Sequence, residues 1–191
     1  MEFFNYKTKV VPSKGRILVS EPYLPDPNFE RSIVLLCEHN EQGSFGFILN
    51  KPSTSTVSEL MEGVTSFDLP VFIGGPVEQN TLHFVHRHQG LPGTTEIGDG
   101  IYWGGDFERL LFLLETKQIL PGDLKFFLGY SGWGAGQLAE ELNTDSWIVS
   151  DRLDDELLFE TDPNKMWQKS LQSMGGRFSV YSNYPIDPRL N

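Results

Sequence analysis

Short apolar runs, separated by glycine, proline and polar turns, dominate the hydrophobic pattern of this chain. The segment 32–38, SIVLLCE, is apolar on both alternating faces apart from its ends, which is typical of a central strand buried on both sides. A short polar loop ending in Gly43 separates it from the run 44–50, so the two runs predict a β-hairpin. Lys51-Pro52 should then stop the pairing, because proline lacks the N–H donor.

Two longer helices carry boundary signals. In 106–118, Asp106 can cap the first turn, and the apolar positions that follow at i, i+3, i+4 and i+7 form a core-facing stripe of Phe107, Leu110, Leu111 and Leu114. In 161–174, Thr161-Asp162-Pro163 supplies a cap and a proline at the first helical position, and Gly175-Gly176 should end the helix. A short helix is also predicted over 56–61, with Ser55 or Thr56 as its cap.

The remaining runs complete the expected fold. Further strands are predicted over 16–21, 71–73, 82–86, 100–103, 124–130 and 146–150. The order mixes hairpins with strand–helix units, and no internal repeat is present. We therefore expect one α+β domain over residues 1–191, in which helices pack on a mixed, largely antiparallel sheet and residues 1–14 form a partly ordered arm.

The most conspicuous motif is GYSGWGAGQLAEEL, residues 129–142, which predicts a glycine-rich turn between a strand and a helix. A G-x-S-x-G nucleophile elbow starting at Gly129 would have Trp133 where a glycine is needed, and that side chain would crowd the strained turn. A G-x-G-x-x-G dinucleotide turn starting at Gly132 would have Gln137 in place of its third glycine, although a helix N-terminus there would still favour an anion. The favoured interpretation is structural: the glycines let the backbone fold tightly while Trp133 wedges against the sheet.

Charge and cysteine content narrow the function classes. The chain has 191 residues and a net charge of −11, an average field that repels nucleic acid. Its one basic concentration, formed by Lys7, Lys9, Lys14 and Arg16, is interpreted as a solvated arm rather than a nucleic-acid arm. Cys37 is the only cysteine, so no intrachain disulfide can form. Because no signal-peptide core and no apolar run of ~20 residues is present, we expect a soluble cytoplasmic protein with no membrane contact.

Polar groups at strand ends are the candidate ligand-binding residues. His39 could bond a backbone carbonyl and brace the hairpin loop, or it could line a pocket with Asn50 and with Gly74-Gly75. Cys37 should be buried and inert, since it alternates with the apolar residues of its strand. His39 is expected on the same strand face, so a Cys–His pair stays open, although side chains two apart on a strand rarely meet well enough for proton transfer.

A metal site and a catalytic acid are disfavoured. His86 and His88 should share one strand face and His83 the other, and neither a carboxylate nor a cysteine is adjacent to them in sequence, so strand histidines without metal are the expectation. Asp26 lies in a proline-rich loop and should accept hydrogen bonds from turn N–H groups. No second carboxylate pairs with it, so no catalytic residue is assigned.

Several sequence blocks together resemble the YqgE/AlgH family of bacterial proteins, and the resemblance covers nearly the whole chain. The blocks are GRILVS at 15–20 with Asp26 and Phe29, SIVLLCEH at 32–39, GSFGFILNKP at 43–52, GGPV at 74–77 and GYSGWGAGQL at 129–138. The resemblance implies a compact α+β fold whose sheet folds toward a pseudo-barrel. One branch of that family carries the label of transcriptional regulator; no biochemical activity, catalytic residue or cofactor comes with the resemblance.

Three hypotheses for function follow. The preferred one is a non-enzymatic cytoplasmic protein that acts through a protein partner or as a homo-oligomer, with a role in gene expression implied by the resemblance. The alternative is a small-molecule binding protein or hydrolase, whose candidate residues are His39, Asn50, Gly74, Gly75, Ser131, Gly132 and Gly134. Direct nucleic-acid binding is the weakest hypothesis, because of the net charge.

Overall fold

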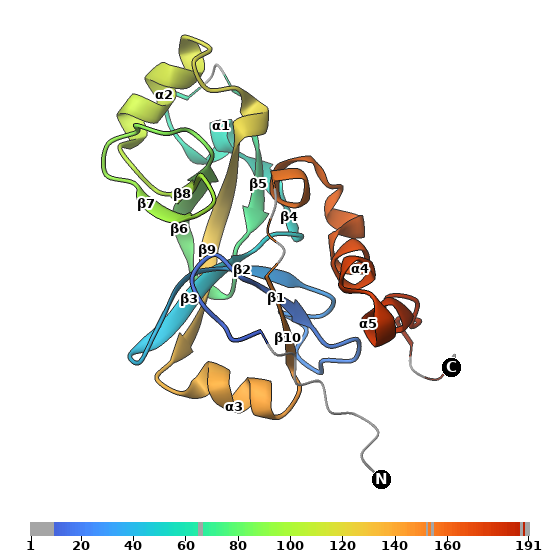
Figure 1. The fold of residues 1–191 in the computed structure, drawn as a ribbon. Coiled ribbons are helices and arrows are strands. Elements are labelled where there is room, and N and C mark those ends of the chain that lie inside the picture. The colour runs from blue at the N-terminus through green and yellow to red at the C-terminus, as the bar shows by residue number, and fades with distance from the viewer. Residues whose placement is uncertain (1–9, 65–66, 152, 154, 188, 190–191) are drawn as a thin grey trace.

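A computed structural model describes residues 10–64, 67–151, 153, 155–187 and 189, and these form an α+β domain built on one ten-stranded sheet that does not close into a barrel (Figure 1). Its strands are β1 (Ile17–Ser20), β2 (Ile33–Asn40), β3 (Gly43–Ile48), β4 (Pro52–Thr56), β5 (Pro70–Ile73), β6 (Val77–His86), β7 (Thr95–Gly98), β8 (Ile101–Trp103), β9 (Leu124–Gly134) and β10 (Trp147–Ser150). The predicted fold class is confirmed. Of the expected N-terminal arm, residues 1–9 lie outside the described residues.

Short helices surround the sheet. They are α1 (Val57–Leu60), α2 (Phe107–Glu115), α3 (Gln137–Asn143), α4 (Pro163–Met174) and α5 (Gly176–Tyr181), together with a 3-10 turn at Pro121–Asp123 and a π-helical turn at Glu156–Glu160. The predicted caps are confirmed: Asp106 accepts a hydrogen bond from Arg109 N (2.8 Å), and Asp162 accepts one from Asn164 N (2.9 Å). Helix α2 lies at one end of the molecule, α3 at the other, and α4 and α5 along one side (Figure 1).

Strand β9 joins the two halves of the sheet. The strand order is β10-β1-β2-β3-β9-β6-β8-β7, with β5 paired to β9 and β4 paired to β5. The first part of β9 pairs in parallel with β5 and antiparallel with β6, and its last four residues, Ser131–Gly134, pair antiparallel with β3. Every other strand pair among the described residues is antiparallel, as the sequence predicted.

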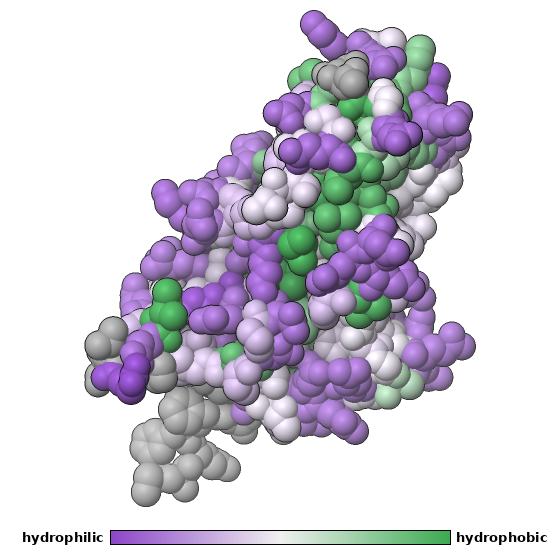
Figure 2. Space-filling model, turned by 180° about the vertical axis from the view of Figure 1, so that it is seen from behind, coloured by the Kyte–Doolittle hydropathy of each residue, from purple (hydrophilic) through white to green (hydrophobic). Residues whose placement is uncertain are grey.

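Apolar side chains fill both faces of this sheet. On one face, β1, β2, β3 and β9 pack against α4, α5 and the π-helical turn, with Phe47, Phe127 and Trp167 among the members of this main core. On the opposite face, α3 covers the same strands through Leu138. An upper core joins α1 and α2 to β5, β6 and β9. Seen from behind, hydrophobic residues gather in a band along the upper half of the molecule (Figure 2).

A tight backbone crossing explains two of the glycines. Strands β5 and β6 lie on opposite edges of β9, yet only Gly74, Gly75 and Pro76 connect them, so the chain must pass directly over β9. A Cβ on Gly75 would lie 2.2 Å from the backbone carbon of Tyr130, and one on Gly74 would lie 2.4 Å from the carbonyl oxygen of Gly129. Only glycine permits so close an approach of two backbones.

Several predicted boundaries are wrong. The stretch expected to be a glycine-rich turn continues β9 as far as Gly134, and the turn itself is confined to Ala135-Gly136. Pro52 begins β4 instead of ending the pairing, because the first residue of a strand needs no ladder N–H. Strand β7 and helix α5 were not predicted.

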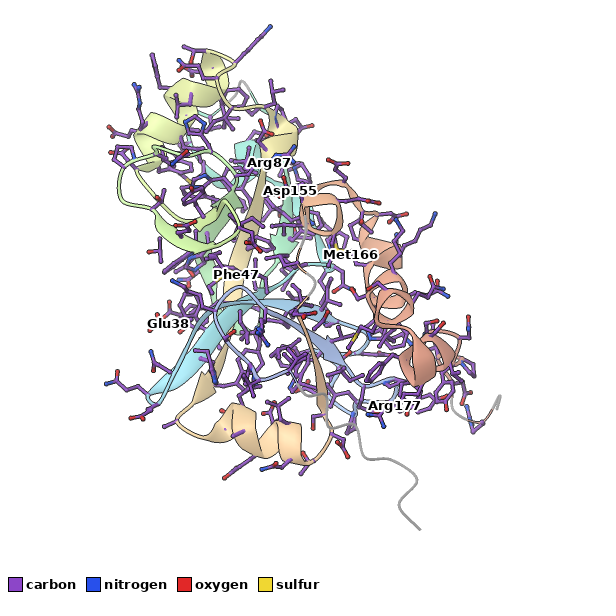
Figure 3. All side chains as sticks on the ribbon, viewed as in Figure 1. Glu38, Phe47, Arg87, Asp155, Met166 and Arg177 are labelled. Atoms are coloured by element: carbon purple, nitrogen blue, oxygen red, sulfur yellow. The ribbon has the colours of Figure 1, made fainter. Side chains whose placement is uncertain are left out.

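An ion-pair network ties the C-terminal segment to the upper half of the molecule. Arg87 Nε lies 2.9 Å from Asp123 Oδ1, and its Nη1 lies 3.1 Å from Asp155 Oδ2 (Figure 3). The guanidinium also lies 5.1 Å from the ring centre of Phe159. Of the helices in the described part of the chain, none combines the length and apolar character that crossing a bilayer requires.

Candidate functional site

A hollow of about 610 Å³ opens beside the tip of the β2–β3 hairpin. Its lining residues come from five strands and the hairpin turn: Glu38, Asn40, Gln42, Gly43, Ser44, Phe45, Val77, His83, Trp103, Tyr130, Gly132, Trp133 and Gly134. We call this region the aromatic hollow. Glu38 lies on the outer part of the hairpin and Phe47 nearer the middle of the molecule (Figure 3), so the hollow is the solvent-open continuation of the main core.

Four ring systems form its wall. The ring centres of Phe45 and Trp103 are 4.9 Å apart, and those of Phe45 and Tyr130 are 6.1 Å apart. The imidazole of His83 lies 6.2 Å from Tyr130 and 6.5 Å from Trp103. These separations fall within the range in which rings interact edge to face. The wall is therefore prearranged and presents both ring faces and ring edges to an occupant.

Glycines form the floor, because strand pairing places them opposite one another. Gly43 is the cross-strand partner of Gly134, and Phe45 is the partner of Gly132. A Cβ on Gly132 would lie 3.2 Å from the Tyr130 ring. A Cβ on Gly134 would meet nothing closer than the Gln137 side chain at 3.9 Å, so a side chain at this position would enter free space. The hollow exists because these positions carry no side chain.

A β-bulge at Cys37 aims Glu38 toward the hollow. The register skips from the pair Leu36–Gly46 to the pair Glu38–Phe45, so Cys37 has no partner in β3. Two consecutive residues of a bulge lie on nearly the same face, and the alternation after it is inverted. Glu38 therefore lies on the face of Phe45, whereas His39 lies on the opposite face. The expectation that His39 shares a face with Cys37 is wrong for this reason.

The electrostatics of the hollow favour a positively charged occupant. Glu38 is its only carboxylate, and none of the described lining residues is lysine or arginine. Burial lowers the pKa of His83, against a smaller opposing effect of the Glu78 carboxylate, so the imidazole is neutral at pH 7. Cations bind over the faces of Trp, Tyr and Phe rings. Rings, a neutral imidazole and one acidic group together suit an amine or a guanidinium.

One edge of β9 is open beside the hollow. Strand β6 pairs with β9 only as far as Val77–Tyr130, and in the described part of the chain nothing but β3 pairs with Ser131–Gly134. The N–H of Gly134 points away from β3, since it donates to Gln137 Oε1 (3.0 Å). Gly132 has the same strand parity, so its backbone groups also point to the open edge. An extended peptide that displaces the Gln137 side chain from Gly134 N could pair there.

The predicted pocket that joined His39 to Asn50 is not formed. His39 Nδ1 lies 2.6 Å from Ser44 Oγ and faces a separate hollow of about 480 Å³ beside α3. Asn50 lies at the far end of the hairpin, where it accepts from Ile33 N (3.0 Å) and donates to Arg31 O (2.9 Å). The two residues occupy opposite ends of the same two strands.

Of the other predicted site residues, only Gly132 and Gly134 line the aromatic hollow. Gly74 and Gly75 form the backbone crossing over β9. The hydroxyl of Ser131 is fully buried and donates to Gly74 O (3.0 Å), so it fastens that crossing. Trp133 is 5% exposed and packs against the sheet beside Leu138, as predicted.

Glu141 fixes the two tryptophans on the α3 face. Its Oε2 accepts hydrogen bonds from Trp133 Nε1 (2.8 Å) and from Trp147 Nε1 (2.7 Å). Its Oε1 accepts one from Gln137 Nε2 (2.9 Å). This carboxylate therefore satisfies two nearly buried indole donors and holds α3 in place.

The histidines and the cysteine have structural environments. His86 is fully buried; its Nε2 donates to Gly104 O (3.0 Å) and its Nδ1 accepts from His88 N (3.2 Å), while burial lowers its pKa. His83 lies on the opposite face of β6, as expected. The described residues contain no group of three or more His, Cys, Asp or Glu side chains that could hold a metal ion. Cys37 is buried, and burial raises the pKa of its thiol.

Sequence reasoning missed most of the aromatic hollow. Phe45, Trp103 and Tyr130 were treated as strand residues, and the bulge that re-aims Glu38 carries no local sequence signal. Lys125 was also missed, although a lysine within the apolar run LKFFL was a visible anomaly. A signal for Tyr130 was present, because it directly follows Gly129 in the motif at 129–142.

The fold and the hollow define an α+β protein with an aromatic hollow beside an open sheet edge. The sequence matches the family model described as AlgH-like (DUF179) over residues 17–179, so the chain belongs to this family. It is 51% identical to a UPF0301 protein of Cytophaga hutchinsonii over 94% of this chain and 99% of that protein. It is 44% identical to one of Chlorobium limicola, over 93% and 95% of the two chains.

Two solved structures share the fold. The solution structure of the AlgH protein from Pseudomonas aeruginosa has a TM-score of 0.71 at 27% identity and covers 94% of this chain and 98% of its own. A crystal structure of a protein from Corynebacterium diphtheriae has a TM-score of 0.74 at 24% identity, with 92% and 94% covered. The resemblance found in the sequence is confirmed.

Proposed function

We propose that this protein is a non-enzymatic binding protein that captures an extended segment of a protein partner at the aromatic hollow. The observation that carries the proposal is the combination of a prearranged aromatic wall with an unpaired strand edge at Ser131–Gly134. Strand addition to an open edge gives affinity through backbone hydrogen bonds, and a neighbouring pocket gives specificity through one side chain.

The partner segment carries a lysine or an arginine that enters the hollow. Its ammonium or guanidinium would lie among Phe45, Trp103 and Tyr130, with the Glu38 carboxylate at the rim. The net charge of −11 adds a long-range attraction for a basic segment and a repulsion for nucleic acid. In this proposal, any effect on gene expression is exerted through that partner in the cytoplasm and not by direct DNA binding.

A small organic cation is the second candidate occupant. The volume of about 610 Å³ lies within the ~300–1,000 Å³ typical of small-molecule pockets. Such a ligand would use the rings and Glu38 but would not need the open strand edge. The two candidates therefore differ in their dependence on backbone pairing.

Selection from a random peptide library, followed by titration of the selected peptides, tests the proposal. We expect selected sequences to contain a basic residue, and amide NMR shifts on binding to centre on Gly132 and Gly134. Replacing the basic residue of the peptide with norleucine should weaken binding at least tenfold, since about 1.4 kcal/mol or more of cation–ring and carboxylate attraction is lost. N-methylation of the peptide backbone should weaken it as well if strand pairing contributes.

A matched pair of glycine variants supplies the control. Gly134→Val places a side chain in the hollow without a clash and should abolish binding, whereas Gly122→Val, at the far end of β9, should leave it unchanged. Binding that survives Gly134→Val, or selected peptides without a basic residue, would refute this site. Tight binding of a small amine with no peptide selected would favour the second candidate.

A further inference from the structure

A second cavity, remote from the aromatic hollow, contains a buried lysine. It has a volume of about 180 Å³ and lies between the start of β9 and the segment that enters α4. Its lining residues are Leu69, Pro70, Phe72, Pro121, Gly122, Leu124, Lys125, Phe126, Phe159, Thr161 and Pro163. Among the described residues of this lining, Lys125 has the only ionisable side chain, and it is 9% exposed.

The ammonium group of Lys125 has few partners. Its Nζ donates one long hydrogen bond to Leu49 O (3.3 Å) and lies 4.3 Å from the ring centre of Phe72. Among the described residues no carboxylate forms an ion pair with it. Two acids that adjoin lining residues in sequence are engaged elsewhere: Asp123 binds Arg87 and Leu120 N, and Asp162 caps α4.

Such an environment is costly for a charged amine and suits a neutral one. An unpaired ammonium loses hydration on burial, and one hydrogen bond to a neutral acceptor does not offset the free energy of that loss. Burial accordingly lowers the pKa of Lys125 to about 8. At pH 7 roughly a tenth of the amine is then neutral, against about 0.03% for a lysine with the ordinary pKa. A neutral amine is a nucleophile, and this one belongs to a residue that lines an apolar cavity and lies over the ring of Phe72, another lining residue.

We propose that this cavity binds a small uncharged aldehyde or ketone, which forms an imine with Lys125. The nitrogen lone pair attacks the carbonyl carbon, so a C–N bond forms as the C=O π bond opens, and one amine proton moves to the oxygen to give the carbinolamine. The C–O bond then breaks as the C=N bond forms, and the oxygen leaves as water with the second amine proton. The reaction needs no oxidant or reductant, and water reverses it. The apolar lining favours an uncharged carbonyl compound over a carboxylate, and a volume equal to about six water molecules limits it to a few heavy atoms.

Reductive trapping tests this assignment independently of the aromatic hollow. The folded protein is incubated with propanal and cyanoborohydride at pH 7, and propylation of each lysine is followed by peptide mass spectrometry. We expect Lys125 to be modified at least tenfold faster than the exposed Lys165, with a rate that levels off above about pH 8. Lys125→Arg should fold and show no fast modification.

Two further variants make the outcome decisive. Gly122→Val narrows the cavity and should slow modification of Lys125, whereas Gly134→Val, which fills the aromatic hollow, should not change it. A long branched aldehyde should modify Lys125 more slowly than propanal does. The assignment is overturned if Lys125 is modified no faster than Lys165. It is also overturned if the modification rate of Lys125 depends neither on aldehyde size nor on the Gly122 substitution. Loss of peptide binding at the hollow would leave this result untouched.

Discussion

Replacing Lys125 with methionine should change the pH dependence of stability in a calculable way. Methionine keeps the length and apolar stem of the side chain and removes the amine. Burial lowers the pKa of this amine from 10.5 to about 8. Because the folded-state pKa lies below the unfolded one, the unfolded chain holds the proton more tightly, and stability rises with pH between the two values.

The expected size follows from this shift. At pH 7 the unfavourable burial of the ammonium amounts to about 3 kcal/mol, and at pH 9.5 to about 1.4 kcal/mol. Between pH 7 and pH 9.5, the free energy of unfolding of wild type should therefore rise by about 2 kcal/mol more than that of Lys125→Met. Loss of the long hydrogen bond to Leu49 O should cost the variant at most about 1 kcal/mol at both pH values.

Urea denaturation followed by tryptophan fluorescence, at both pH values, measures this difference. Effects of pH on all other groups are common to the two proteins and cancel. Lys165→Met, at an exposed lysine of α4, serves as the control and should track wild type at both pH values. A gap between wild type and Lys125→Met that does not change with pH would show that the amine is hydrated in the folded protein, and the reasoning from burial would fail.

Substitutions at three further positions, Glu141, Gly75 and His86, test the packing of the fold. Glu141→Ala leaves two nearly buried indole N–H groups without an acceptor and should lower the free energy of unfolding by about 2–4 kcal/mol. Glu141→Gln keeps an acceptor oxygen, so its loss should be less than half of that. Urea denaturation measures both. Gly75→Ala should cost about 3 kcal/mol or more, or prevent folding, while Gly122→Ala should shift the melting temperature little. Burial lowers the pKa of His86 below its usual 6.5, so wild type should lose stability relative to His86→Gln as the pH falls from 7 to 5. If the free energies of unfolding of the two proteins change with pH in parallel, protonation of His86 does not destabilise the fold.

Much of the fold follows from local signals in the sequence. The Asp106 and Asp162 caps, Pro163 and Gly175 act within one turn of chain, so the start of α2 and both ends of α4 were predictable. The end of α2, expected at residue 118, lies at Glu115, where the sequence offers no glycine or proline as a stop signal. The buried runs of β2 and β3 were equally clear. What failed depended on distant partners: β9 extends to Gly134 because β3 pairs with its last residues, and β4 begins at Pro52 because β5 lies beside it.

The candidate site was predicted only in part, for a physical reason. Gly132 and Gly134 were identified, but the hollow above them is made by side chains from four other strands. A single unpaired residue at Cys37 decides that Glu38, and not His39, faces this hollow. Strand alternation derived from sequence assumes an unbroken register, so it placed His39 on the wrong face and gave no sign that Glu38 lines the hollow.

The backbone crossing at Gly74-Gly75 also constrains how the molecule folds. Strands β5 and β6 both pair with β9, which follows them much later in the sequence, so the place between them stays empty until β9 has paired. Until then they share no partner, and the upper and lower halves of the sheet remain unconnected. The rate-limiting step should therefore be closure of these long loops around β9, which gives slow folding and one concerted transition for the whole chain.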